Sequence, residues 1–550
     1  MFTAARTAIA AQYSANGLKR VPAQMQMRVI EERQQLTIVG CEAGFAVIAN
    51  DDMFNPVLGY SDRALDENDM APGFRWWLDA MNEQLAYNAA HGIPLKAVSP
   101  ADAGLPESVT ELMVSQWGQD TPFNDQTPTY NSGGTEVHYV TGCVATAMAQ
   151  IMYFHRWPEK GKGSISYYFT PEGSDASQKL SDNLAKKPYD WDNMLPVYKG
   201  KSWTQAQRDA VSTLMKHCGY AVKMQYTRSG SGAFTHDAAD VLSKRFYYNE
   251  NQHYYVRETF PVDEWMEKIY FELSDRHPVL YGANKGTNGS GHEFVLDGYN
   301  KDGQVHVNWG WEGKSDGYFD IASLNGYTLG QEMVLVRKND EDVTFQSFWG
   351  TYDGMTASYR TGKISASAYV MNFDYHTFTG NLMLMAQNLA TGETVELSSK
   401  SVERIEYLNE DENGNCYYRN LDFSGINVSN ALTEDGTYRI YMASFDTSKD
   451  VEPQPIRCHE SNSNSYLLTI NGSKISLKDE KNANWTAQTG IEQIRLSSIT
   501  TNNGDGMTRV YNAAGQKVYE APAKSFSLDD VPANGILMLK NGKTVKKVLK

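Results

Sequence analysis

A cysteine at the expected start of a helix carries the clearest chemical signal in this sequence. Cys143 follows Gly142, and residues 144–154 place apolar side chains at three- and four-residue spacing, which predicts one face of a helix that Pro158 ends. Unpaired N–H groups and the dipole at the start of a helix favour negative charge, so we expect a lowered thiol pKa there. Cys143 is therefore a candidate nucleophile. The competing interpretation is a buried structural cysteine on a core helix.

A thiolate nucleophile needs a base, a group that orients the base, and donors for the oxyanion. His292 lies on an expected strand about 150 residues after Cys143, a separation typical of a cysteine and a histidine that the fold brings together. Asn308 and Trp309 follow on the next expected strand, where an Asn side chain can accept from the imidazole and a tryptophan excludes water. Gln119 precedes the helix and can lend its amide to an oxyanion hole. Each residue alone also has a structural interpretation, but their order together is specific.

These segments resemble the streptopain family of secreted cysteine proteases, a branch of the papain superfamily that includes interpain. The resemblance covers roughly residues 20–340 and rests on residues 142–147, 149–152, 306–311 and 315–317. It implies a two-lobed, papain-like α+β domain in which Cys143 is the nucleophile and His292 the general base. It further implies that Gln119 serves the oxyanion hole and that Asn308 and Trp309 share the orientation of the histidine.

The same resemblance implies a substrate-binding surface. Trp311 belongs to it, and the positions that contact the substrate backbone are Ser229, Gly230, Ser231 and Gly291. Glu293 departs from the family, which usually has a small residue directly after the catalytic histidine. If Glu293 faces the cleft, it predicts a pocket that tolerates basic side chains. Strand alternation equally allows Glu293 to face solvent.

Composition excludes several other functions. The chain has 550 residues and a net charge of −16, which leaves no basic excess for nucleic acid or an anionic membrane. Its 5 cysteines include no C-x-x-C pair, which argues against a zinc knuckle or a disulfide scaffold, and the expected chemistry needs neither metal nor cofactor. No run of about 18 apolar residues predicts a transmembrane segment. The first residues lack an apolar core long enough for a signal peptide.

The sequence predicts four domains. Residues 1–97 read as a small α+β unit, with strands within 29–39 and 44–49 and a helix opening at Pro72; by resemblance this is an inhibitory prodomain. Residues 98–340 form the protease domain. Residues 341–478 contain short alternating runs separated by turns, which favours an immunoglobulin-like β-sandwich. After a polar linker at 479–490, residues 491–550 form a small β domain with a hairpin from 509–511 to 517–519, and this domain resembles sorting domains for secretion.

The sequence thus predicts a secreted or cell-surface cysteine endopeptidase made as a zymogen. Its expected partners are protein or peptide substrates, its own prodomain as an intramolecular inhibitor, and secretion machinery that engages the C-terminal domain. Two alternatives stay open. One is a catalytically inert adhesin or inhibitor-like binding protein on the same fold. The other is transglutaminase-like acyl transfer by the same cysteine and histidine.

Overall fold

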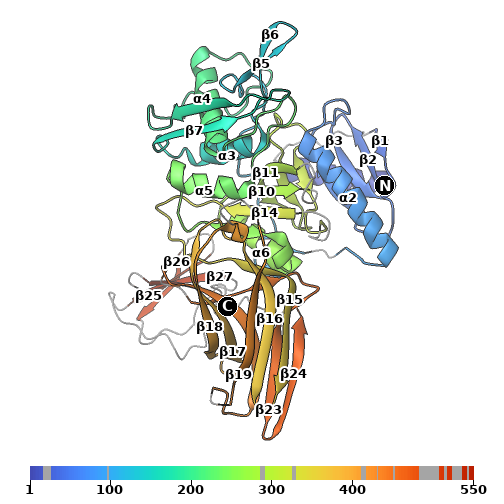
Figure 1. Cartoon of the computed structure of the whole chain (residues 1–550). Coiled ribbons are helices and arrows are strands. Elements are labelled where there is room, and N and C mark those ends of the chain that lie inside the picture. The colour runs from blue at the N-terminus through green and yellow to red at the C-terminus, as the bar shows by residue number, and fades with distance from the viewer. Residues whose placement is uncertain are drawn as a thin grey trace. The chain divides into compact units, whose positions relative to one another are not determined.

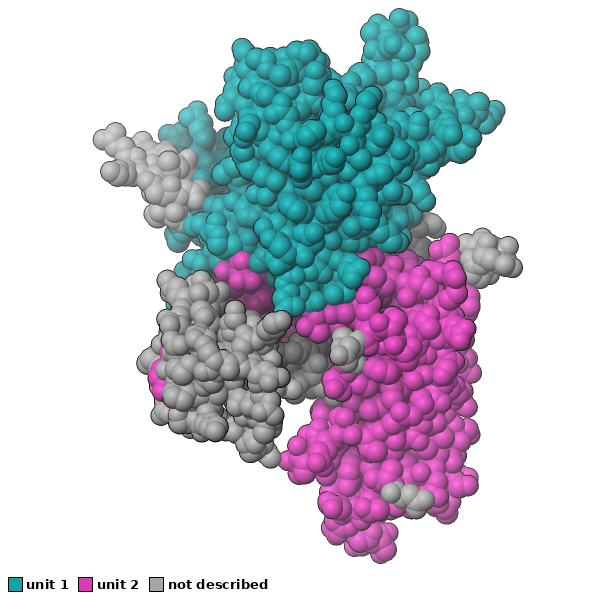
Figure 2. Space-filling view, turned by 90° about the vertical axis from the view of Figure 1, so that its left-hand side faces the viewer, with its two compact units in different colours: residues 1–99, 107–257, 276–343 teal, residues 100–106, 258–275, 344–550 magenta. Residues whose placement is uncertain are grey.

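The chain forms two compact units, shown as ribbons in Figure 1 and in separate colours in Figure 2. The structure is a computed structural model that describes residues 1–15, 26–95, 98–284, 291–324, 330–410, 416–429, 431–449, 452–481, 507–512, 517–522, 536–541 and 544–549. Unit 1 comprises residues 1–99, 107–257 and 276–343. Unit 2 comprises residues 100–106, 258–275 and 344–550.

The N-terminal part of unit 1 contains two helices and four strands. They are α1 (Phe2–Ala15), β1 (Arg28–Glu32), β2 (Leu36–Cys41), β3 (Gly44–Ala49), β4 (Val57–Ser61) and α2 (Pro72–His91). The segment 29–39 is a hairpin and not one strand, because the polar residues after β1 form a turn in which the Arg33 N–H donates to the Leu36 carbonyl at 2.9 Å. The expected helix at Pro72 is confirmed. Proline occupies its first turn, and Gly92 ends it with a φ of 64°.

One ten-stranded sheet runs through unit 1 in the order β1-β2-β3-β4-β13-β12-β11-β10-β14-β9. The strands not yet introduced are β9 (His253–Val256), β10 (Val279–Asn284), β11 (Gly291–Tyr299), β12 (Val305–Asn308), β13 (Gly317–Phe319) and β14 (Gly330–Leu335). The N-terminal strands join this sheet where Tyr60 pairs with Tyr318. A Cβ at Gly317 would collide with the Tyr60 carbonyl oxygen, so only glycine allows this approach. Strands β1 to β4 are thus hydrogen-bonded into the sheet that carries His292.

The remaining elements of unit 1 are helices and short hairpins. They are β5 (Thr129–Ser132), β6 (Thr135–His138), α3 (Cys143–His155), β7 (Ser164–Phe169), β8 (Gln178–Asn183), α4 (Gln205–Ala221) and α5 (Thr235–Phe246). Residues 144–153 of α3 are all buried, which is the pattern of a helix enclosed by its neighbours. This helix packs against α4 and strand β11. The helix predicted at Cys143 is confirmed, and it ends three residues before Pro158.

Unit 2 contains α6 (Val262–Ser274) and two sheets that share one core. The first sheet has the order β19-β16-β15-β22, and the second has β18-β17-β20-β23-β24 with β21 paired to β20. Apolar residues from both sheets, among them Ile364, Leu384 and Ile440, form a single buried cluster. The strands are β15 (Trp349–Arg360), β16 (Lys363–Asn372), β17 (Phe378–Asn388), β18 (Thr394–Ile405), β19 (Arg419–Asn427), β20 (Gly436–Asp446), β21 (Gln454–Pro455), β22 (Arg457–Cys458), β23 (Ser463–Asn471) and β24 (Lys474–Lys481).

The C-terminal residues form a further sheet in the order β26-β25-β27-β28. Its strands are β25 (Met507–Asn512), β26 (Lys517–Pro522), β27 (Ile536–Asn541) and β28 (Thr544–Leu549). The hairpin expected from 509–511 to 517–519 is confirmed, since Val510 pairs with Tyr519. Most of the expected linker at 479–490 lies outside the described residues. Within the described part of the chain, no helix is long and apolar enough to cross a membrane.

Candidate active site

Cys143 is the first residue of α3, and the glycine before it determines how closely other segments approach. Gly142 has a φ of 93°, a conformation that side chains disfavour. A Cβ there would lie 2.7 Å from the Met224 sulfur and 2.9 Å from the Ser231 carbonyl oxygen. Glycine at 142 therefore lets the loop that contains Ser231 lie directly against the start of α3.

Backbone N–H groups act on the Cys143 thiol. Those of Glu293 on β11 and of Val144 lower its pKa. Burial nevertheless raises the thiol pKa to about 11, because desolvation of a thiolate here outweighs those donors. The expectation that the helix start lowers the thiol pKa is wrong for this structure, and burial is the physical reason.

His292 lies on β11 directly before Glu293, and β11 packs against α3. Burial lowers the pKa of the half-buried imidazole to about 4. Within the described residues, no hydrogen bond joins the imidazole to the thiol. The strand of His292 thus packs beside the start of α3, and burial favours the neutral form of both the imidazole and the thiol.

Gln119 is fixed beside the approach to α3. Its backbone carbonyl accepts from both the N–H of Thr141 at 3.1 Å and the Thr141 hydroxyl at 3.0 Å. Thr141 stands two residues before Cys143, and Gln119 itself is buried at 7% exposure. Gln119 therefore lies next to the first turn of α3.

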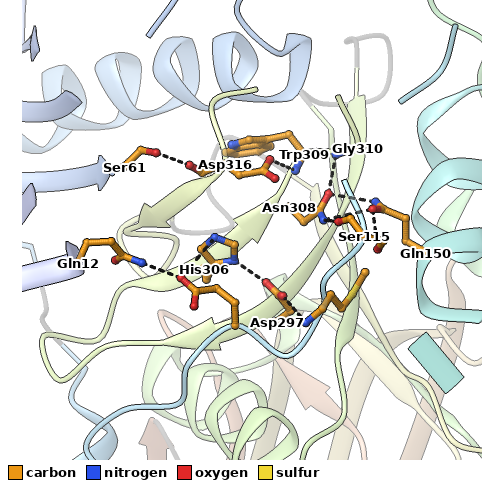
Figure 3. A network of polar contacts seen from close by, with 12 residues as sticks. Gln12, Ser61, Ser115, Gln150, Asp297, His306, Asn308, Trp309, Gly310 and Asp316 are labelled. Atoms are coloured by element: carbon orange, nitrogen blue, oxygen red, sulfur yellow. Dashed lines mark hydrogen bonds and ion pairs between the residues drawn. The ribbon is translucent and has the colours of Figure 1, made fainter. Parts of the chain in front are cut away.

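Asn308 is buried in a polar network (Figure 3). Within the described residues it makes no hydrogen bond to His292. Its Oδ1 accepts from Gln150 Nε2 and from the Gly310 N–H, both at 3.0 Å. Its Nδ2 donates to the Ser115 carbonyl at 2.8 Å and to Gln150 Oε1 at 3.2 Å. These contacts join β12 to α3.

Gln150 is the residue of this network that sequence reasoning missed. It is fully buried, and its Oε1 also accepts from the Ser115 hydroxyl at 3.0 Å. Its position seven residues after Cys143, two turns along the same helix face, is a usable signal. A polar side chain inside the apolar run at 144–154 needs a buried partner, and Asn308 is that partner.

The two tryptophans after Asn308 occupy different surroundings. The Trp309 N–H donates to Asp316 Oδ1 at 3.0 Å, and its ring lies 4.9 Å from the ring of Phe294, two residues after His292. Trp309 is 3% exposed. Trp311 is half-buried and hydrogen-bonds to Asp69 in the N-terminal part of the chain.

The expected substrate-contact positions divide by exposure. Ser229, Gly230 and Gly291 are exposed, whereas Ser231 is buried and its hydroxyl donates to the Val140 carbonyl at 2.7 Å. Glu293 is only 4% exposed, so the solvent-facing orientation considered for it is wrong. Its Oε2 accepts from the Thr235 hydroxyl at 2.8 Å. The reason is that β11 is covered on the face where Glu293 points.

A polar cavity of about 330 Å³ is lined by Gln12, Asp62 and Arg63 from the N-terminal part and by Asp297, His306 and Asp316 from the sheet region. Around it, Gln12 Nε2 donates to Glu111 Oε1 at 2.7 Å, and the Ser61 hydroxyl donates to the Asp316 carbonyl at 2.6 Å (Figure 3). The sequence offered no signal for this cluster, because its members come from five separate segments. Within the described residues, no group of three His, Cys, Asp or Glu side chains could hold a metal ion.

The sequence matches the Peptidase C10 family over residues 117–319 and the Spi protease inhibitor family over residues 10–85. The chain belongs to the Peptidase C10 family of cysteine peptidases, the streptopain family, and carries an inhibitor-type prodomain before the peptidase region.

Streptopain of Streptococcus pyogenes is 30% identical over 296 residues, which cover 52% of this chain and 73% of streptopain. The thiol protease/hemagglutinin PrtT of Porphyromonas gingivalis is 33% identical over 319 residues, which cover 54% of this chain and only 36% of PrtT. The solved structure of a prointerpain A fragment from Prevotella intermedia, in a variant with one cysteine replaced by alanine, is 36% identical. It matches with a TM-score of 0.52 and covers 56% of this chain and 98% of the fragment.

Proposed function

We propose that this protein is a cysteine endopeptidase made as a zymogen, with Cys143 as nucleophile and His292 as general base. In the proposed reaction the thiol gives its proton to the imidazole, and the sulfur bonds to the carbonyl carbon of the substrate. The Gln119 amide and the Cys143 N–H bind the resulting oxyanion. The C–N bond breaks as the imidazolium protonates the leaving amine, and water then hydrolyses the thioester to release the acid and restore the thiol.

The observation that carries this proposal is the packing of α3, which begins at Cys143, against β11, the strand that carries His292. It brings the strand of His292 to a buried helix, within the segment that matches the peptidase family. Gln119, whose carbonyl accepts from the Thr141 hydroxyl, would supply the oxyanion donor. The nucleophile, the base and the oxyanion donor of the proposed acyl transfer would then all lie near the start of α3.

The pKa values of Cys143 and His292 support an inactive zymogen. With a thiol pKa of about 11 and an imidazole pKa of about 4, both groups are neutral at neutral pH, and a thiolate–imidazolium pair is disfavoured. The N-terminal segment is hydrogen-bonded into the same sheet through β4 and β13. We infer that removal of this prodomain allows His292 to approach Cys143, so that the charged pair can form.

The other site residues receive supporting roles. Trp309, packed on Phe294, and Asn308, bonded to Gln150, hold the strands next to His292 in place. The substrate backbone would run along the exposed positions near the start of α3. Glu293 would lie behind the wall of the pocket next to the scissile bond, and the assigned contact residues are Ser229, Gly230, Ser231, Gly291 and Trp311.

The regions that follow the peptidase are candidates for export and display. We propose that residues 341–478 form an immunoglobulin-like module and that residues 491–550 engage secretion machinery, which would place the enzyme outside the cell. The two-sheet core of unit 2 supports a sandwich, and the four-stranded C-terminal sheet fits a small independent domain.

Replacement of Cys143 by alanine tests the enzyme proposal. Cys143→Ala should abolish hydrolysis of a denatured protein and self-removal of the prodomain, while Cys416→Ala, at an exposed cysteine, should preserve both. Full activity of Cys143→Ala would reject the assignment, and an inert wild-type chain with an unreactive Cys143 would favour the binding-protein alternative. Competition of an added primary amine with water for the acyl group would indicate transglutaminase-like transfer.

A further inference from the structure

Two glutamates flank a glycine in the middle of the sheet, close to Cys143. Gly282 on β10 pairs with Glu293 on β11 on one side and with Glu332 on β14 on the other. Directly paired residues of antiparallel strands point to the same face of a sheet. The side chains of Glu293 and Glu332 therefore lie on the same face of the sheet, on either side of Gly282.

The space above Gly282 is filled by the Glu293 carboxyl and the Thr235 hydroxyl. A Cβ at Gly282 would lie 2.5 Å from Glu293 Oε2 and would collide with that hydroxyl. Thr235, the first residue of α5, donates its hydroxyl proton to Glu293 Oε2 at 2.8 Å. The other oxygen of Glu293, Oε1, is buried and has no hydrogen-bond partner.

Such a site favours a neutral Glu293. A buried carboxylate with one unsatisfied oxygen and a second carboxylate nearby is costly, so one proton is retained by the pair. Burial first, and then the charge of Glu332, raise the pKa of Glu293 to about 8 against the lowering effect of the Thr235 hydroxyl. Burial raises the pKa of Glu332 as well.

Glu293 acts on Cys143 in two ways with opposite effects on the thiol. Its backbone N–H lowers the pKa of the thiol, whereas the charge of its ionised carboxyl raises that pKa. Among the described residues, the charged group that acts on Glu293 is Glu332 on β14, and Cys143 on α3 is the group on which Glu293 acts. Thr235 on α5 contributes a hydroxyl, and Gly282 on β10 contributes no side chain.

We propose that Glu293 is a positioning residue for Cys143: its neutral carboxyl, held by Thr235 and Glu332, permits the thiol to ionise, and its loss of a proton opposes that ionisation. Ionisation of the acid pair thereby raises the pH that thiolate formation requires. This inference rests on the proposed role of Cys143 as nucleophile. Alkylation of Cys143 can nevertheless be measured whether or not the protein hydrolyses peptides, so the two proposals fail separately.

The test is the rate of alkylation of Cys143 by iodoacetamide, resolved by peptide mass spectrometry on the full chain between pH 6 and 10. Exposed Cys416 in the same sample reports the reactivity of the reagent. Glu293→Gln keeps the side-chain shape and an acceptor for Thr235 but carries no charge. It should leave the Cys143 rate at pH 6 unchanged and raise it roughly three- to tenfold at pH 9, as expected for a thiol pKa lowered by half a unit to one unit.

Glu332→Gln should change the rate of Cys143 alkylation in the opposite direction. Loss of the neighbouring charge lowers the pKa of Glu293, so its carboxyl ionises at lower pH, and Cys143 alkylation between pH 6.5 and 8 should fall below that of the wild-type chain. A merely structural role would move both variants in the same direction. Equal shifts, or a Glu293→Gln profile that matches wild type, would overturn the proposal.

Thr235→Val supplies an independent check if a glutamine variant fails to fold. It removes the hydroxyl that lowers the pKa of Glu293. Glu293 should then stay neutral to higher pH, and Cys143 alkylation near pH 8 should rise above that of the wild-type chain. An unchanged or lower rate would count against the inference.

Discussion

His306 Nδ1 lies 2.5 Å from Asp297 Oδ1, and the two side chains form a buried ion pair across strands β11 and β12. Asp297 is 1% exposed, and its Oδ2 accepts from the Met113 N–H at 2.9 Å. Burial alone lowers the pKa of the imidazole, but the charge of Asp297 and its hydrogen bond raise it to about 9. The pair lies beside the cavity where the prodomain meets the sheet.

This ion pair predicts how stability depends on pH. A histidine whose folded pKa lies above its unfolded value of 6.5 stabilises the fold fully below about pH 6.5, and this contribution is lost as the pH rises through 9. His306→Gln should therefore cost about 3 kcal/mol of unfolding free energy at pH 6 and much less at pH 9.5. Chemical denaturation at pH 6, 7.5 and 9.5 measures the difference.

The control for this prediction is His138→Gln. The His138 ring is half-buried and contacts a backbone carbonyl, that of Thr127, at 2.7 Å. Its substitution gives the cost of replacing a histidine whose ring contacts a neutral backbone group. A cost of His306→Gln that stays constant from pH 6 to 9.5 would contradict a charged imidazole.

Ser61 predicts how firmly the prodomain is held. Its hydroxyl donates to the Asp316 carbonyl at 2.6 Å and is 1% exposed. Ser61→Ala leaves that buried carbonyl without its donor, which should weaken prodomain docking by about 1 kcal/mol and speed self-processing about fivefold. Gel assays of prodomain removal over time give the rate. Thr7→Ala, which removes an exposed hydroxyl bonded within α1 to Thr3, should leave the rate unchanged.

Local patterns were sufficient to predict much of the fold. The helices at Pro72 and Cys143 follow from apolar spacing and from prolines, and the hairpin at 509–519 follows from alternation. These features depend on residues close in sequence. Helix α3, which begins at Cys143, packs against β11, the strand of His292, and the roles assigned to the candidate site residues stay predictions.

Features that depend on distant segments could not be predicted. The thiol pKa is raised because the whole fold buries Cys143, and the field of its own helix does not overcome that burial. The orientation of Glu293 depends on Thr235 from another helix. Gln150 and Asn308 acquire their roles only when α3 and β12 meet.

The close approach of Gly73, on helix α2 of the prodomain, to Trp309 predicts that a side chain at position 73 destabilises the protein. A Cβ at Gly73 on α2 would lie 2.7 Å from the Trp309 ring. Alanine is the better helix former by about 1 kcal/mol, yet Gly73→Ala should destabilise the full chain by roughly 1–3 kcal/mol because the ring must move. Thermal unfolding measures this. Arg75→Ala, on the exposed side of the same helix, should change the midpoint little, and a stabilised Gly73→Ala chain would refute the close contact.

Unit 2 contains its own buried ion pair, between Arg457 and Glu264. Arg457 Nη1 donates to Glu264 Oε2 at 2.8 Å, and Lys268 Nζ lies 3.6 Å from Glu264 Oε1. Burial raises the pKa of Glu264, but the charges of Arg457 and Lys268 lower it overall. Residue 264 lies more than 75 positions before the predicted start of the sandwich at 341, and still belongs to the same compact unit as Arg457.

Arg457→Met should therefore destabilise unit 2 by roughly 3–5 kcal/mol, because it leaves the Glu264 carboxylate buried with only Lys268 nearby. Adding Glu264→Gln should recover part of that loss, since the unpaired charge is then removed. Denaturant unfolding of the full chain followed by tryptophan fluorescence compares the single and double variants. If the double variant is as unstable as the sum of the two single variants, the carboxylate and guanidinium do not act as a coupled pair.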